Sequence, residues 1–134
     1  VLSPFDSYQL IRGLKTLSLR MERSTANAQE IVAFLKQSPA VKEVLYTGRG
    51  GMISFKVADE KRIPHILNTL KVFSFAESLG GVESLITYPT TQTHADIPAE
   101  VRHSYGLTDD LLRLSIGIED ARDLIADLSQ ALEG

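Results

Sequence analysis

Two short segments carry the residue types that could bind a small anion. The first is Ser-Leu-Gly-Gly-Val-Glu-Ser-Leu at 78–85, and the second is Arg-Leu-Ser-Ile-Gly-Ile-Glu-Asp at 113–120. Each places glycine beside small hydroxyl residues, and the second begins with an arginine. Glycine lets the backbone approach a ligand because it has no Cβ, and arginine can hold a carboxylate through two parallel hydrogen bonds. The two segments therefore predict half of a pocket for a small anionic molecule.

Arg113 has two interpretations. It lies inside the apolar run Leu111–Leu114, where a charge needs a partner. The residue could form a structural ion pair with Glu83 or Glu119, or lie on an open face of a sheet. Alternatively, it could clamp the carboxylate of a ligand.

Glu77 and Ser78 lie where a predicted strand passes into a loop, a place where rigid scaffolds often present binding residues. The alternative is a tight turn that needs only Gly80 and Gly81. Residue chemistry alone leaves both interpretations open.

Several classes of site are excluded or disfavoured. There are no cysteines, so disulfides and thiolate catalysis are excluded. His65, His94 and His103 do not have metal-ligand spacing, and we expect no metal site. The glycines at 48–51 are not followed by a helix start, which disfavours a phosphate loop. A net charge of -3 argues against a nucleic-acid partner.

The N-terminal part of the chain predicts one long helix. Ser3 can cap it, Pro4 suits its first position, and apolar residues recur at helical spacing as far as Gln37. About 33 residues would span ~50 Å, whereas a compact domain of this size has a radius of gyration of ~14 Å. The helix therefore either kinks, near Gly13 or Thr16–Ser18, or extends to pack on a second body.

The rest of the chain predicts short strands alternating with helices. We expect strands at Val41–Tyr46, Met52–Val57, Val72–Ala76, Val82–Thr87 and Leu111–Ile116, and helices at Asp59–Leu70, at Pro98–Tyr105 and after the capping residue Asp120. A turn at 47–50 would make the first two strands a hairpin. This pattern predicts an α+β two-layer sandwich, with a mostly antiparallel sheet and helices on one face.

Length and composition fit a single packed domain. No apolar run approaches the ~18 residues of a membrane span. The absence of cysteine fits a cytoplasmic protein, which is the location that we expect.

Five stretches of the chain resemble the Cys/Met-metabolism family of pyridoxal-phosphate (PLP) enzymes, which includes cystathionine γ-synthase, the cystathionine lyases and O-acyl-homoserine sulfhydrylases. They lie at 3–6, 12–21, 76–85, 93–94 and 113–120, and they occur in family order. The resemblance covers nearly the whole chain but only the C-terminal third of such an enzyme. It implies the small C-terminal domain of a fold-type I PLP enzyme.

The resemblance also shows what the chain lacks. In the family, the lysine that carries the cofactor lies upstream of the Ser-Pro helix start, in a domain that also supplies the phosphate-binding residues. None of the lysines at 15, 36, 42, 56, 61 and 71 has that sequence context. We therefore expect PLP in the parent enzyme and no cofactor bound by this chain alone.

The family's pocket residues carry over to four positions. Arg113 resembles the arginine that binds the α-carboxylate of the substrate, and Ser78 resembles a serine that lines the pocket. Glu77 falls where the family varies with substrate, and glutamate there resembles cystathionine γ-synthase and γ-lyase. Thr93 resembles a threonine near the substrate side chain.

One region departs from the family. Between Tyr46 and Met52, family members usually carry a further segment of roughly twenty residues. Here a short glycine-containing turn joins the two predicted strands directly.

The resemblance implies β- or γ-elimination or replacement on sulfur amino acids, with cystathionine or an O-acyl-homoserine as substrate. Residues 1–37 would be a helix that leads to the missing cofactor domain, and residues 38–134 would form a wall of the substrate site. We expect the isolated chain to be inactive and the parent to be a homo-oligomer. The alternative is a stand-alone binding or dimerisation module that kept the fold without the catalytic domain.

Overall fold

A five-stranded sheet forms the centre of the molecule in the computed structural model, which describes residues 1–133. The strands lie in the order β1-β2-β5-β4-β3, and their bounds are β1 (Val41–Leu45), β2 (Met52–Val57), β3 (Ser74–Phe75), β4 (Leu85–Thr87) and β5 (Leu111–Ser115). Three of the four pairings are antiparallel, and only β3 and β4 run parallel. The predicted mostly antiparallel α+β sheet is confirmed.

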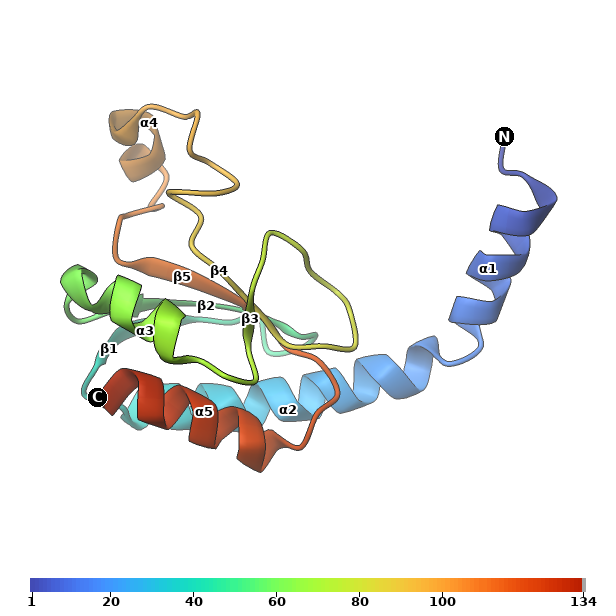
Figure 1. Cartoon of the computed structure of the whole chain (residues 1–134), viewed down its shortest axis with the longest axis horizontal. Helices are drawn as coiled ribbons and strands as arrows, with labels where there is room; N and C mark the ends of the chain where they lie inside the picture. Colours follow the sequence, from blue (N-terminus) through green and yellow to red (C-terminus); the bar gives the residue numbers. More distant parts are fainter. Residues whose placement is uncertain (134) are drawn as a thin grey trace.

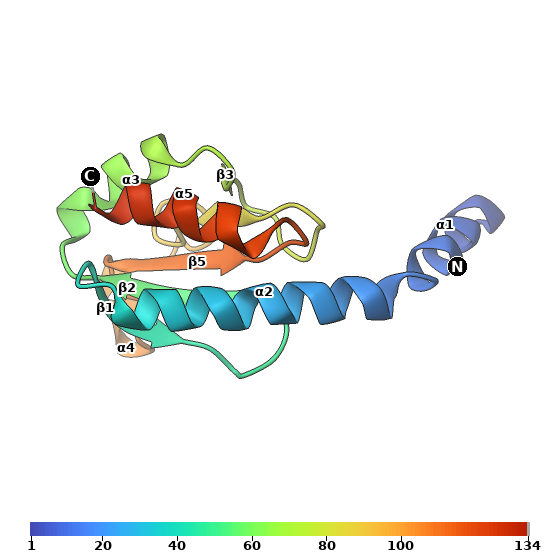
Figure 2. The ribbon, with the colours of Figure 1, turned by 90° about the horizontal axis from the view of Figure 1, so that it is seen from below.

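Three helices cover one face of this sheet. They are α2 (Leu17–Gln37), α3 (Ile63–Thr69) and α5 (Ala121–Glu133). Figure 1 shows α2 and α5 beneath the sheet, with the short helix α4 (Ala99–Ser104) on its other side. Figure 2 shows α3 and α5 above α2 from the helical side. The two-layer arrangement with helices on one face is therefore confirmed.

Burial alternates along β2, whereas every residue of β4 and every residue of β5 except Arg113 is buried. Leu112 and Leu114 of β5 are fully buried and pack in the core with Phe55 of β2. Residues on the other side of each strand point away from the helices, and Arg113 and Ser54 lie opposite each other on this second face. Strand β5 thus presents Arg113 on the sheet face opposite α2, α3 and α5.

The N-terminal part forms two helices with a break between them. Helix α1 (Pro4–Leu14) ends before Lys15, and α2 begins at Leu17. Arg20 bridges the break, because its Nη2 donates to the Gly13 carbonyl at 2.7 Å. Helix α1 has no buried residue and extends away from the sheet in Figures 1 and 2.

Some predicted boundaries were wrong. The expected helix Asp59–Leu70 is a 3-10 turn at Glu60–Arg62 followed by α3. Pro64 lies in the first turn of α3, where an amide hydrogen would have no partner in the helix. The predicted strands at 72–76 and 82–87 are shorter in the structure, where only β3 and β4 are paired, because the loop between them bonds to Ser115 and Glu119. Membrane-spanning helices are absent from residues 1–133, because every helix there is too short or too polar to span a bilayer.

Candidate functional site

The two segments that predicted an anion pocket lie against each other. Ile118 N donates to the Val82 carbonyl at 2.9 Å. Ser84 binds both the Gly117 amide, at 2.9 Å, and the carboxylate of Glu119, at 2.6 and 2.8 Å. Glu119 therefore serves to hold the 78–85 loop against the end of β5.

Glycine has a different purpose in each segment. Gly80 has a φ of 76°, a backbone conformation that other residues rarely adopt. A Cβ at Gly117 would overlap the carbonyl oxygen of Val82. Gly117 thus permits close packing of the two segments on each other.

Arg113 lies in β5 on the sheet face opposite α2, α3 and α5, and β5 runs between β2 and β4. Its Nη2 donates to Thr87 Oγ1 at 3.3 Å, and its Nε is buried without a hydrogen-bond partner. Among the described residues no carboxylate lies within ion-pair distance of Arg113. The structural ion pair with Glu83 or Glu119 is therefore not formed, and the guanidinium retains donors for a ligand.

A hollow of about 380 Å³ opens beside the guanidinium. It is lined by Leu45, Tyr46, Thr47, Met52, Ser54 and Arg113. Burial raises the pKa of Tyr46, and its hydroxyl donates to the Gly50 carbonyl at 2.9 Å. One wall of the hollow is thus formed by the β1–β2 hairpin.

Glu77 and Ser78 directly follow Ala76, which is hydrogen-bonded to Thr87, the residue that contacts Arg113. Thr87 Oγ1 donates to the Ala76 carbonyl at 2.8 Å, and Ala76 N donates to the Ile86 carbonyl at 3.1 Å. Glu77 and Ser78 are exposed at the start of the loop. Neither lines the hollow beside Arg113.

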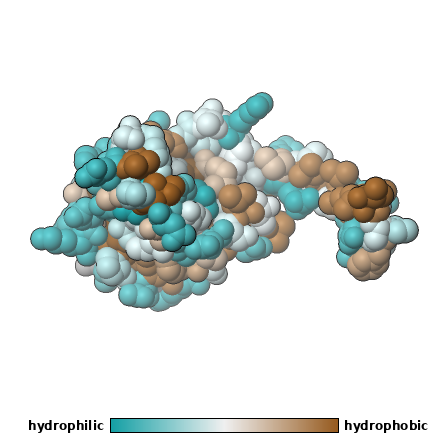
Figure 3. Space-filling model, turned by 90° about the horizontal axis from the view of Figure 1, so that it is seen from above, coloured by the Kyte–Doolittle hydropathy of each residue, from teal (hydrophilic) through white to brown (hydrophobic). Residues whose placement is uncertain are grey.

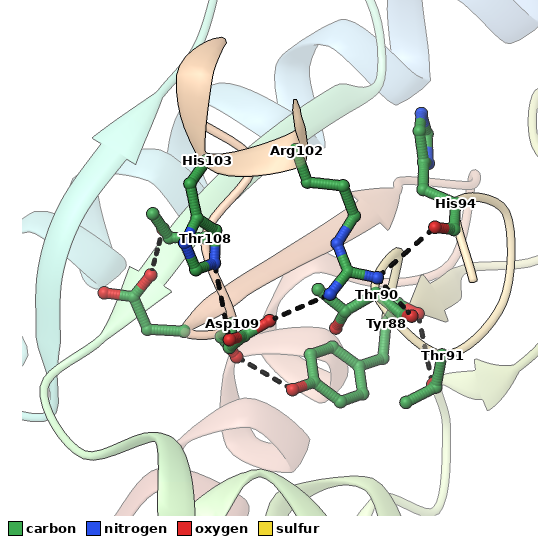
Figure 4. A network of polar contacts seen from close by, with 9 residues as sticks. Tyr88, Thr90, Thr91, His94, Arg102, His103, Thr108 and Asp109 are labelled. Atoms are coloured by element: carbon green, nitrogen blue, oxygen red, sulfur yellow. Dashed lines mark hydrogen bonds and ion pairs between the residues drawn. The ribbon is translucent and has the colours of Figure 1, made fainter. Parts of the chain in front are cut away.

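Thr93 lies in the loop before α4, exposed, with its Oγ1 2.7 Å from His94 Nδ1. Figure 4 shows the polar network that holds this loop. Arg102 Nη1 donates to the carbonyls of Thr90 and His94 at 3.2 and 3.3 Å, and Tyr88 donates to the Asp109 carbonyl at 2.9 Å. The contacts of Thr93 are local, and it does not line the hollow beside Arg113.

The described residues do not fit the cofactor that the resemblance implies. Lys42 and Lys56 are ion-paired, at 3.2 and 3.1 Å, and the other four lysines are exposed. A lysine that binds PLP must lose its proton, and an ion pair opposes this. The amides of Gly50, Gly80 and Gly117 donate to side chains of the protein itself and cannot cradle a phosphate. Residues 1–133 contain no cluster of three metal-ligating side chains.

Thr87 was missed by sequence reasoning although it contacts Arg113. It is 1% exposed and pairs directly with Arg113 across β4 and β5. A hydroxyl residue at the end of an otherwise apolar strand was the available signal. Its importance became visible only once the strand order placed β4 beside β5.

Three curated relatives illustrate what the chain is similar to. A cystathionine γ-synthase/O-acetylhomoserine (thiol)-lyase of Bacillus subtilis is 58% identical over 98% of this chain and 35% of its own length. A cystathionine γ-synthase of Haemophilus influenzae is also 58% identical, over 98% and 36%. A cystathionine γ-lyase of Bacillus subtilis is 49% identical, over 99% and 39%. The chain thus spans little more than a third of the length of these relatives.

The lengths of these matches differ. The two γ-synthase matches extend over 132 and 131 residues, no more than the chain itself. The γ-lyase match extends over 149, against 134 residues in the whole chain, so this lyase carries at least 15 residues that the chain lacks.

Solved structures and the family model agree with these relatives. A cystathionine γ-lyase from Micromonospora echinospora superimposes with a TM-score of 0.94 at 37% identity, over all of this chain and 39% of that protein. The model described as Cys/Met metabolism PLP-dependent enzyme matches residues 1–133. The chain therefore belongs to the Cys/Met metabolism family of PLP-dependent enzymes.

Proposed function

We propose that this chain is the carboxylate-binding C-terminal part of a PLP-dependent transsulfuration enzyme. The observation that supports this most is the state of Arg113. Its guanidinium lines a hollow, donates one hydrogen bond to the uncharged hydroxyl of Thr87, and has a buried Nε without a partner among residues 1–133. Such a group is costly to bury unless a ligand completes its hydrogen bonds. The α-carboxylate of an amino-acid substrate has the geometry that the guanidinium fork matches.

The role of the chain would be to orient the substrate. PLP, when bound by the remainder of the protein, supplies the electron sink for elimination or replacement at the β- or γ-carbon. Arg113 would fix one end of the substrate, and such positioning can contribute large rate factors. We propose that the chain binds no cofactor by itself and is inactive alone.

Glu77, Ser78 and Thr93 would form the part of the pocket that distinguishes substrates. Glu77 and Ser78 support this proposal by following Ala76, which Thr87 links to Arg113. Thr93 lies on a loop that Arg102 holds in place. The family resemblance is the main support for assigning the three side chains to the substrate.

Within the family, we propose a γ-synthase type of reaction, in which the sulfur of cysteine replaces the acyloxy group at the γ-carbon of an O-acyl-homoserine and the acyl group leaves as a carboxylate. Both γ-synthase relatives match at higher identity than the γ-lyase and without the additional residues that the γ-lyase carries. Those residues would fall beside Arg113 if they belong between Tyr46 and Met52, since Tyr46 and Met52 both line the hollow.

The N-terminal helices support a further part of the proposal, that residues 1–37 pack on the cofactor-binding domain of the parent. Helix α1 and the start of α2 expose many large apolar side chains: Phe5, Tyr8, Leu10, Ile11, Leu14, Leu17, Leu19 and Met21. Figure 3 shows apolar side chains at the end of the molecule that α1 forms. Exposed apolar groups on this scale mark an interaction surface.

The same surface favours a second candidate, a non-catalytic module that associates through α1 with a further copy. The first candidate predicts an active full-length enzyme, because it includes a domain that binds PLP. The second predicts no catalytic activity.

The test compares the full-length protein with the 134-residue chain, both supplied with PLP. Each is assayed for cystathionine formation from O-acetylhomoserine and cysteine, and for cystathionine cleavage. We expect turnover by the full-length protein alone, with formation faster than cleavage. Sustained turnover by the short chain would overturn its assigned role, an inactive full-length protein would favour the module, and faster cleavage would refute the synthase assignment.

A further inference from the structure

We propose that Thr87 is a positioning residue, which sets the orientation of the Arg113 guanidinium and couples it to the segment that carries Glu77 and Ser78. The inference rests on the proposed function, because it assumes that Arg113 binds the substrate carboxylate. It adds a residue to which the family resemblance assigned no role.

The direction of the Thr87 hydroxyl bond follows from its two contacts. A hydroxyl has one proton to donate, and the carbonyl of Ala76, at 2.8 Å, is an acceptor only. The proton therefore goes to Ala76. The lone pairs of Oγ1 then accept from Arg113 Nη2, at 3.3 Å. Both contacts are formed by one oxygen, so the two partners cannot move independently.

The surroundings make this oxygen the principal restraint on the guanidinium. Thr87 is 1% exposed and lies on β4 directly opposite Arg113, so backbone pairing fixes its place. Arg113 Nε has no partner, and no carboxylate among the described residues reaches the side chain. An arginine side chain is flexible, and holding it in one rotamer costs entropy. Without the Thr87 contact, the substrate would have to bear that cost on binding.

Thr87 also fixes the start of the loop that carries Glu77 and Ser78. Ala76 is held by Thr87 at its carbonyl and by the Ile86 carbonyl at its amide. Glu77 is the next residue. A shift of the guanidinium therefore displaces the start of the loop, and the distance between the carboxylate clamp and the proposed substrate-selecting residues is set through Thr87.

The test uses the full-length enzyme with O-acetylhomoserine as the varied substrate and cysteine at saturation. Thr87→Val keeps the shape and removes the hydroxyl, whereas Thr87→Ser keeps the hydroxyl. We expect T87V to raise KM about tenfold, as for loss of a hydrogen bond to a charged group, with kcat changed less than KM. T87S should stay within about twofold of wild type on the same scale.

Thr69→Val is the matched control, because the Thr69 hydroxyl donates to the His65 carbonyl of its own helix, α3, at 2.7 Å and lies outside the proposed site. The same exchange there should leave KM unchanged. A double variant gives the second readout. On the Arg113→Lys background, T87V should add less than about twofold in KM, because residues that act through one contact are not additive.

Three outcomes would overturn the inference while leaving the role of Arg113 intact. They are an unchanged KM in T87V when R113K is impaired, a T87S as impaired as T87V, and a full T87V effect on the R113K background. An unaffected R113K would instead remove the proposed function and this inference with it. Should T87V fail to fold, Thr87→Cys keeps a side chain of similar size with weaker hydrogen bonding, and the same KM criteria apply.

Discussion

Replacing Arg113 with lysine isolates the geometry of the proposed clamp, because the positive charge is kept. The guanidinium fork can give a carboxylate two parallel hydrogen bonds, whereas an ammonium group acts as a point charge. The loss of one charge-assisted hydrogen bond costs about 1.5–3 kcal/mol. This corresponds to a fall in kcat/KM of roughly 10- to 150-fold. The exchange also removes the Nη2 donor to Thr87. It therefore weakens both the contact of residue 113 with the substrate and its contact with the protein.

The assay is cystathionine formation by the full-length protein, with kcat and KM measured separately for O-acetylhomoserine. Arg122→Lys is the matched control, because the Arg122 side chain is 87% exposed at the start of α5 and, among residues 1–133, forms an ion pair with Asp120 alone. R122K should behave as wild type. A folded R113K enzyme with unchanged kcat/KM would refute the clamp.

Three other outcomes follow from the structure of the domain. Asp127→Asn should lower the free energy of unfolding by about 3 kcal/mol in urea titration, because the buried carboxylate accepts from three consecutive backbone amides at 2.8–3.0 Å; an unchanged midpoint would contradict this. Gly117→Ala should destabilise the domain by about 1–3 kcal/mol through overlap with the facing loop, whereas Gly13→Ala, which meets nothing within 4 Å, should favour helix α1 in circular dichroism. The side-chain hydrogen bond from Arg122 holds the pKa of Asp120 well below its ordinary value, so this ion pair contributes stability above pH ~4 that fades as pH falls further; the stability difference between wild type and Asp120→Asn should shrink in acid, and a difference that grows would refute the assignment.

Local signals in the sequence predicted much of the fold. Ser3 accepts from the Asp6 amide at 3.1 Å, as expected of a helix cap. The apolar run around Arg113 predicted a strand, which β5 confirms, and left the partner and orientation of the arginine open. These features depend on residues within a few positions of each other, and periodicity records them directly.

Features that depend on distant parts of the chain were not predicted. The carboxylate of Asp127 holds backbone amides more than fifty residues away. An acid on the apolar stripe between Leu124 and Leu128 was a signal of a buried partner, but not of which partner. In the same way, Thr87 became part of the site only through the pairing of β4 with β5.

A structure of the full-length protein with a bound amino-acid substrate would test the central claim most directly. The measurement is the distance from the guanidinium nitrogens of Arg113 to the α-carboxylate oxygens. We expect two parallel contacts of about 2.7–2.9 Å, with Nη2 still bonded to Thr87. A carboxylate held by other residues, with Arg113 more than ~4 Å away and beyond ion-pair reach, would contradict it.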